Sequence, residues 1–305
     1  GRSRNSRPVL QPGNLVVACW RARLEDQLGT FTVEPVEMRA AGLIAETLEN
    51  STHADGAHSL ATLITGPAAH SITFHHNLWA HHFDRMPRVV TGPGNIVDVV
   101  NNVMYDWANV AAIAKNNNGL LQFNLVGNYF KSGPETGSSY PCQLDGTAHV
   151  DGIEAYLSGN IAPGFRDNDT QDEDLIVHPS VGRQYVVAER HDAAPVTTTS
   201  AATAYDDVLS GAGATLPTLD DADLRILADV ANGTGGLIDA PADVGGWPTL
   251  TGGTAPTDTD ADGIPDTWET DHGLNPNSAA DGASASPSGY TWLEVYIHEL
   301  SSSLP

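Results

Sequence analysis

The sequence predicts an all-β protein built as a parallel β-solenoid, followed by helices and a small calcium-binding module. Three observations support this prediction: a short apolar alternation ending in asparagine recurs along the first half of the chain, helix-capping signals follow it, and an acidic loop of regular spacing lies near the end. With 305 residues, of which 40% are hydrophobic, the chain is long enough to bury a sizeable core.

The repeat is clearest in Ser71–Val90, where Ile72 and Phe74 alternate with polar residues, which is the period of a β-strand. The pattern breaks at an asparagine, and similar segments break in the same way further along. The steps are 25, 26 and 32 residues, between Asn77, Asn102, Asn128 and Asn160. We expect an earlier repeat ending at Asn50 and another over residues 14–24.

Steps near 25 residues are typical of one rung of a solenoid, whose inward side chains are buried only when the next rung stacks on them. Asparagine suits a repeated bend, because it tolerates the left-handed conformation and its amide can bond to neighbouring rungs. The alternative is an antiparallel sandwich with asparagine turns, which predicts closer turns and more hairpin signals.

Two helices are predicted after the repeats. The first is capped by Ser200 and ends at Gly211 or Gly213, and the second has acids in its first turn and Gly233 after its last. We expect them to pack on the solenoid or to cover its end. The predicted domains are a solenoid over residues 1–190, a helical segment over 191–250 and a calcium module over 251–305.

The acidic loop near the end is the strongest local motif. Its oxygen ligands have the spacing of an EF-hand loop, with Gly263 at the turn, and the expected ligands are Asp258, Asp260, Asp262, the Ile264 carbonyl, Asp266 and Glu269. A second helix follows over residues 290–300. Before it, serines 284, 286 and 288 replace the acids of a second loop, so we expect one structural Ca²⁺. An acidic surface turn is the alternative.

Charge limits the partners. The formal net charge of −24 argues against general binding of nucleic acid or of an anionic membrane, which both need a basic face. No run of about 18 apolar residues is present to span a membrane. Cys19 and Cys142 are too few to define a disulfide framework, and their pairing is left open.

Three segments carry a resemblance to a known family: HHNLWAHHFDRMPRV, VDVVNNVMYDW and LVGNYFKSGPET. They resemble the pectate lyases of polysaccharide lyase family 1, and the similarity extends from about Gly42 to the end. It implies a right-handed parallel β-helix and a secreted, monomeric enzyme that cleaves an acidic polysaccharide, polygalacturonate or pectin, by calcium-assisted β-elimination.

The resemblance also assigns residues. Arg85 matches the first arginine of the R-x-P-x-x-R motif, which abstracts the proton; Val90 stands where the second arginine is expected, and Arg88 is its substitute. The substrate contacts that we expect are Arg88, His53, His58, His81, His82, Lys115 and Lys131. Catalytic calcium is left open, because the segment between Asp26 and Gly42 lacks the family's acidic stretch and offers only Asp26, Glu34 and Glu37.

Alternatives to this interpretation are kept for both the base and the function. The base is Arg85 or one of His75, His76, His81 and His82, which titrate near neutrality without a large shift. The protein is a lyase on pectate, a lyase on another uronan, or a carbohydrate-binding solenoid that has lost catalysis. A hydrolase ranks below these, because Asp98 and Asp106 are not grouped like paired catalytic carboxylates.

Overall fold

The computed structural model describes residues 36–39, 42–50, 59–66, 71–137, 139–148, 150–215, 218–249 and 253–303. These residues fall into two compact units. The larger contains the described residues up to Thr215 and those from Leu219 to Pro248, and the smaller contains Thr218 and those from Thr249 on. The predicted domain boundaries at 190 and 250 stay predictions.

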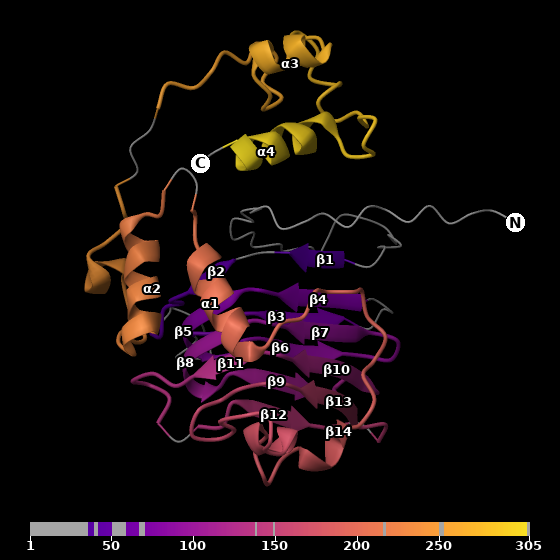
Figure 1. Cartoon of the computed structure of the whole chain (residues 1–305), viewed down its shortest axis with the longest axis vertical. Coiled ribbons are helices and arrows are strands. Elements are labelled where there is room, and N and C mark those ends of the chain that lie inside the picture. The colour runs from indigo at the N-terminus through magenta and orange to yellow at the C-terminus, as the bar shows by residue number, and fades with distance from the viewer. Residues whose placement is uncertain are drawn as a thin grey trace, which may run out of the picture. The chain divides into compact units, whose positions relative to one another are not determined.

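The larger unit is built from three parallel sheets (Figure 1). The first sheet has the order β1 (Val36–Arg39), β4 (Ser71–His75), β7 (Ile96–Val100), β10 (Leu121–Val126), β13 (Ile153–Ser158) and β14 (Val186–Val187). The second has β11 (Tyr129–Lys131), β8 (Val103–Val110), β5 (Leu78–Asp84) and β2 (Leu43–Ala45). The third has β12 (Cys142–Asp145), β9 (Ala112–Lys115), β6 (Arg88–Thr91) and β3 (Leu63–Gly66).

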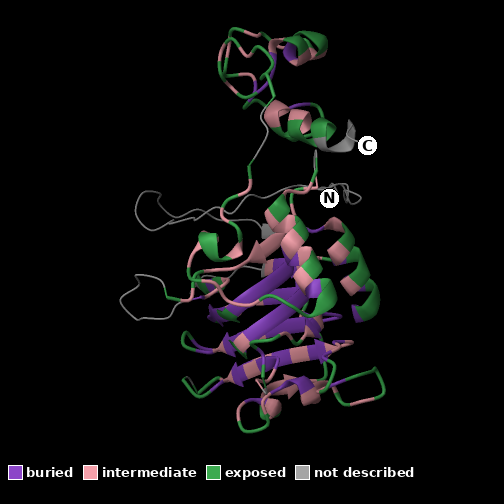
Figure 2. Cartoon of the chain, turned by 90° about the vertical axis from the view of Figure 1, so that its left-hand side faces the viewer, coloured by how far each residue is buried: buried purple, intermediate pink, exposed green. Residues whose placement is uncertain are grey.

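The chain visits the three sheets in turn, through β4, β5 and β6 and then through β7, β8 and β9. Every pairing between these strands is parallel, with β4 against β7 and β5 against β8. This topology is consistent with the predicted parallel β-helix, and it excludes the antiparallel sandwich for the described strands. Side chains alternate along each strand, and Trp79, Phe123 and Leu144 belong to one buried core. The strands of the larger unit are largely buried in Figure 2.

The predicted asparagine ladder is confirmed. The side-chain amide of Asn77 donates to Asn102 at 2.9 Å, Asn102 donates to Asn128 at 3.0 Å, and Asn128 donates to Asn160 at 3.0 Å. In each rung the left-handed conformation is taken by the residue before the ladder asparagine. This residue is His76 or Asn101 in the first two rungs and a glycine in the next two.

The prediction for Asn50 is wrong. Strand β2 pairs with β5 so that Leu43 lies beside Leu78, which places Gly42 at the position equivalent to Asn77. Asn50 instead donates its amide to Asp239 at 2.8 Å. The repeat expected over residues 14–24 lies outside the described residues.

Both predicted helices after the repeats are present. Helix α1 (Ala201–Gly211) begins after Ser200, whose hydroxyl accepts from the Thr203 amide at 3.1 Å. Helix α2 (Asp221–Asn232) ends at Gly233, which has φ 73°. Val208 and Val230 from these helices pack with Leu78 and Tyr105 of the second sheet. Figure 1 shows α1 and α2 on the side of the unit where β5, β8 and β11 lie. Short 3₁₀ helices are η1 (Glu173–Ile176), η2 (Arg183–Tyr185) and η3 (Pro241–Val244).

The segment that leads from β14 to α1 runs back across several rungs. Arg190 donates to Asp98 of β7 at 2.9 Å, and the His191 amide donates to Asn124 of β10 at 3.1 Å. The Thr199 amide then donates to Asn101 at 2.8 Å. We call residues 190–199 the crossing segment.

The smaller unit contains α3 (Asp266–His272) and α4 (Trp292–Ser303). Trp268 stacks on His272 with ring centroids 3.7 Å apart, and its indole donates to Glu299 of α4 at 2.9 Å. No helix in the described part of the chain has the length and apolar character needed to cross a membrane.

Candidate functional site

Arg85 lies in the turn that joins β5 to β6, with φ 73°. Its backbone is held between two neighbouring rungs, since its carbonyl accepts from the Thr62 amide at 2.7 Å and the next amide, of Met86, donates to Ala111 at 2.7 Å. The Arg85 side chain is 21% exposed, and its Nε lies 3.5 Å from Asp84. Arg85 is therefore fixed at a rung corner and stays accessible to a polymer outside the stack.

The surroundings of Arg85 lower its pKa. Partial burial of the guanidinium disfavours its charged form and is the largest effect, the Asp84 charge opposes it, and the charge of Arg88 lowers the pKa further. A neighbouring cation and partial burial are the two features that move an arginine toward acting as a base.

Arg88 and Lys115 share the outer face of the third sheet. Val89 and Ala114 point into the core, and the sheet register places Arg88 beside Ile113 and Val89 beside Ala114. Because side chains alternate along a strand, Arg88 and Lys115 face outward from neighbouring rungs. Val90 follows on the same face, next to Lys115. The substitution of valine for the expected second arginine thus removes a cation from this surface.

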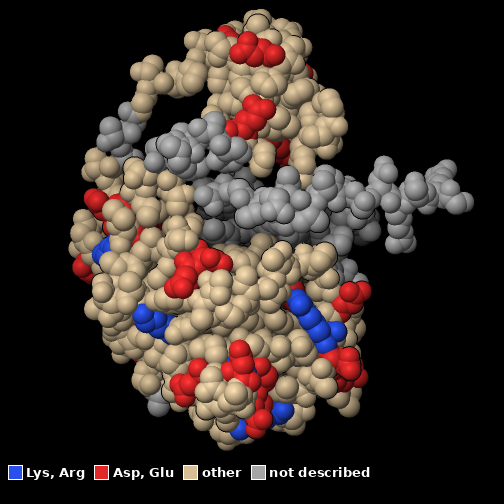
Figure 3. All heavy atoms as spheres, viewed as in Figure 1, with Lys and Arg blue, Asp and Glu red and all other residues tan. Residues whose placement is uncertain are grey.

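Lys115 is partly neutralised. Its ammonium lies 3.3 Å from Asp145 on β12, one rung further. The Thr147 hydroxyl and, to a lesser degree, Lys115 keep the pKa of Asp145 below its usual range, which keeps this carboxylate charged. Lys and Arg are few among the acidic groups on the face drawn in Figure 3, so any anion-binding site is local.

Lys131 is held by groups of the protein itself, and its predicted contact with substrate stays a prediction. It lies on β11 of the second sheet, and its ammonium donates to the Tyr205 hydroxyl at 3.0 Å and to the Ala231 carbonyl at 3.2 Å. It therefore caps the C-terminus of α2, where a cation is favoured by the helix dipole.

His81 and His82 are also wrong as substrate contacts, because both are fully buried. The same burial removes them as bases for a sugar outside the stack. The Nε2 atom of His82 donates to the Ile44 carbonyl at 3.0 Å, and burial lowers its pKa to about 4. His75 and His76 lie at the opposite end of β5 from Arg85, which is about 20 Å for a strand of seven residues.

His53 and His58 lie outside the described residues, as do Asp26 and Glu34, and no side chain is described for Glu37. The backbone that follows His58 does lie beside the Arg85 turn, since the Phe83 amide donates to Ser59 and the Ala61 amide donates to Asp84. Both histidines stay predictions.

The acidic loop of the smaller unit gathers four carboxylates. Oxygens of Asp260, Asp262, Glu269 and Asp281 lie within 4.8 Å of one another. Glu269 is fully buried, and neither of its carboxylate oxygens has a hydrogen-bond partner. Burial and the charges of Asp260, Asp262, Asp281 and Asp266 raise the pKa of Glu269 to about 7. Buried, mutually repelling oxygen ligands fit a hard cation such as Ca²⁺.

Asp281 was missed by sequence reasoning, because it follows the loop by twelve residues in a stretch with no regular spacing of acids. Gly282 beside it permits the close approach, since a Cβ there would lie 2.1 Å from Asp262. Asp258 and Asp266 accept backbone bonds within the loop, from Gly263 at 3.0 Å and Thr259 at 2.7 Å, and as ligands they stay predictions.

No family model matches the chain. Three curated relatives named "probable pectate lyase C" are similar to it: those of Aspergillus flavus, 34% identical over 266 residues, Neosartorya fischeri, 34% over 261, and Emericella nidulans, 33% over 269. The matches cover 83–84% of this chain and 59–60% of each relative. This chain thus spans about three fifths of the length of these relatives.

A shorter match, 52% identical over 64 residues, covers 21% of this chain and 24% of the DNA repair protein RecO of Sinorhizobium medicae. It is too small a share of either protein to bear on the site. The long matches show that this chain is similar, over most of its length, to proteins named as probable pectate lyases.

Proposed function

We propose that the protein is a secreted pectate lyase with a right-handed parallel β-helix, which cleaves polygalacturonate by β-elimination and releases 4,5-unsaturated oligogalacturonides. The observation that carries the proposal is the position of Arg85: it is partly exposed, it lies at a rung corner beside Arg88, and its pKa is lowered by burial and by that neighbour. The curated relatives named as pectate lyases support the same reaction.

In the proposed reaction, neutral Arg85 takes the C5 proton of a galacturonate unit. The C5–H electron pair forms the C4=C5 double bond, and the C4–O bond breaks toward the leaving oxygen, which then takes a proton. The C6 carboxylate must be neutralised while negative charge develops next to it. Arg88 and Lys115, on the outer face of the third sheet, supply positive charge for this purpose.

We propose a structural role for calcium in the smaller unit, with Asp260, Asp262, Glu269 and Asp281 as ligands. Bound Ca²⁺ supplies charge neutralisation to a buried carboxylate cluster and so holds the loop against α3 and α4. No residue of this cluster belongs to the Arg85 turn. The involvement of calcium in the elimination itself stays a prediction of the family resemblance.

The decisive experiment follows the ultraviolet absorbance of the unsaturated product on polygalacturonate, with wild type, Arg85→Ala and Arg85→Lys, in calcium and in chelator. We expect loss of at least about a hundredfold in rate for Arg85→Ala, since general-base removal typically costs 10²–10⁴. Equal rates for wild type and Arg85→Ala would refute Arg85 as the base.

A second candidate is a carbohydrate-binding β-helix without catalysis. Val90 in place of an outward cation and the pairing of Lys115 with Asp145 favour it, because both reduce the positive charge that the reaction needs. Binding of polygalacturonate without any unsaturated product, on pectate and on other uronans alike, would support the binder and overturn the lyase.

A further inference from the structure

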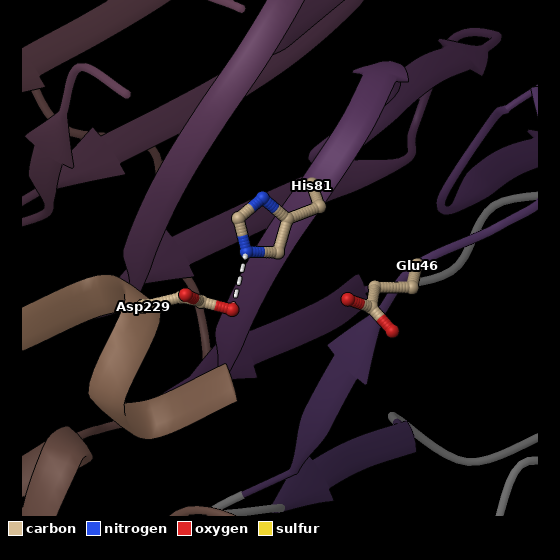
Figure 4. Close-up of side chains that lie close together, drawn as sticks. All are labelled: Glu46, His81 and Asp229. Atoms are coloured by element: carbon tan, nitrogen blue, oxygen red, sulfur yellow. Dashed lines mark ion pairs between the residues drawn. The ribbon is translucent and has the colours of Figure 1, made fainter. Parts of the chain in front are cut away.

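A second cluster of potential ligands lies in the larger unit, where α2 meets the second sheet (Figure 4). It consists of Glu46, His81 and Asp229, whose ligand atoms lie within 4.8 Å of one another. Glu46 and His81 occupy equivalent positions of neighbouring rungs, because Ala45 of β2 pairs with Ala80 of β5. Both have a left-handed backbone, with φ 54° and 57°, which turns their side chains toward α2.

The imidazole of His81 is oriented by the next rung. Its Nδ1 donates to Asp106 at 2.8 Å, which leaves the lone pair of Nε2 on the opposite side of the ring. His81 is fully buried and Nε2 has no hydrogen-bond partner. Oδ2 of Asp229 lies 3.8 Å from Nε2, so two acceptors face each other in a buried place. Such an arrangement calls for a cation between them.

The carboxylate of Asp229 is also oriented by a hydrogen bond. The Thr234 hydroxyl donates to its Oδ1 at 2.7 Å, and this leaves Oδ2 toward His81. Asp229 lies in the last turn of α2, where the helix dipole disfavours an acid. A bound cation at this point would compensate both the carboxylate and the helix end.

The charges do not balance without a cation. Glu46, Asp106 and Asp229 surround His81. Among the described residues, the guanidinium that pairs with this group is that of Arg225, which binds Glu46 and lies 3.6 Å from Asp229. Two negative charges therefore remain when His81 is neutral. A proton on His81 compensates one of them, whereas a divalent cation compensates both.

Gly235 leaves space for an ion. Its φ of 82° is in the left-handed region, and a Cβ at this position would lie 2.7 Å from both His81 Nε2 and Asp229 Oδ2. The absence of a side chain keeps the volume beside these two ligand atoms clear.

We propose that Glu46, His81 and Asp229 bind a divalent transition metal ion of the zinc class. One imidazole nitrogen and two carboxylate oxygens are ligands that zinc accepts, and the Asp106–His81 pair reproduces the carboxylate–histidine–metal arrangement that orients such ligands. Calcium is disfavoured by the nitrogen ligand. The ion joins α2 to β2 and β5, so its role is structural, and it is independent of the proposed lyase reaction.

The test uses the full chain without an affinity tag, stripped of metal by a chelator and then given zinc or cobalt(II). We expect about one zinc per chain after desalting, a rise in Tm with zinc, and visible cobalt(II) absorption of a histidine-ligated site. His81→Gln, Asp229→Asn and Gly235→Ala should each lose the bound zinc and the rise in Tm.

Matched controls are His75→Gln, which removes an imidazole elsewhere, and Glu269→Gln, which disables the calcium cluster; both should retain zinc. Should His81→Gln fail to fold, Asp229→Asn and Gly235→Ala provide the same comparison. The proposal is overturned if wild type retains no stoichiometric zinc, or if these variants retain as much as wild type. A loss of stability in His81→Gln without zinc binding by wild type would identify an ion-pair network instead.

Discussion

The side-chain amide of Asn102 donates to the side-chain oxygen of Asn128 at 3.0 Å, and its own oxygen accepts from the amide of Asn77 at 2.9 Å. Asn102 also donates to the carbonyls of Phe74 and Val100, and it is fully buried. We expect Asn102→Ala to lower the free energy of unfolding by at least about 3 kcal/mol, because each orphaned buried polar group costs about 1–3 kcal/mol. Chemical denaturation measures this, with the exposed Asn117→Ala as control. A change below about 1 kcal/mol would show that the ladder is dispensable.

Arg88→Ala tests the outer face of the third sheet. If Arg88 neutralises the substrate carboxylate, kcat/KM on polygalacturonate should fall about 10- to 100-fold, which is about 1.4–2.7 kcal/mol of transition-state stabilisation. Arg183→Ala, on a 3₁₀ helix outside this sheet, is the matched control and should leave the rate unchanged. The same loss in both variants would point to general charge rather than to this face.

Calcium should bind the smaller unit once. Calorimetric titration of the full chain should give about one ion, and Glu269→Gln and Asp281→Asn should abolish the binding, because they remove ligands from the same cluster. At about 100 times Kd, the ion should stabilise this unit by about 2.7 kcal/mol. Asp271→Asn, an exposed acid of α3, should bind as wild type does. Two ions, or full binding by Asp281→Asn, would contradict this assignment.

Acid should weaken the larger unit through His82. Its pKa is lowered from 6.5 to about 4 by burial, so the folded state resists protonation while the unfolded state accepts it. Above pH 6.5 His82 is neutral in both states and the folded state keeps its full stability. As the pH falls from 6.5 toward 4, protonation of the unfolded state lowers the free energy of unfolding by about 3 kcal/mol in total. Denaturation at several pH values should show a flatter profile for His82→Gln than for wild type; parallel profiles would exclude His82 as the cause.

Cys142 should be unreactive in the folded protein. It is a free, fully buried thiol of β12, and burial raises its pKa to about 12. Alkylation at neutral pH followed by peptide mapping should leave it unmodified until denaturant is added, because the thiolate is the reactive form. Rapid modification of Cys142 in the native protein would contradict this prediction and show that the structure around β12 opens to solvent.

Much of the rung structure was accessible from sequence, because the strand period and the asparagine spacing are local patterns. The ladder at Asn77 and Asn102 and the cap at Ser200 follow from such patterns. The register of β2 was not accessible in this way. Nothing in the sequence near Asn50 shows that Gly42, and not Asn50, takes the position equivalent to Asn77.

The histidines show where sequence reasoning reaches its limit. A run of polar residues next to Arg85 suggested a surface site, but the turn of the backbone at His81 and the arrival of α2, far along the chain, bury its ring. Likewise, the sequence suggested Lys131 as a free cation, but its ammonium donates to a carbonyl in the last turn of α2, which lies about a hundred residues further along the chain. Asp281 and Asp229 join their clusters only through folding, and no local spacing identifies them.

The crossing segment has a mechanical consequence. A stack in which each rung contacts only its neighbours can unzip from either end. Arg190 and Thr199 bind the rung of β7, and His191 binds the neighbouring rung of β10, so fraying at one end must first release the crossing segment. The coils it spans are thereby bound into a single cooperative block.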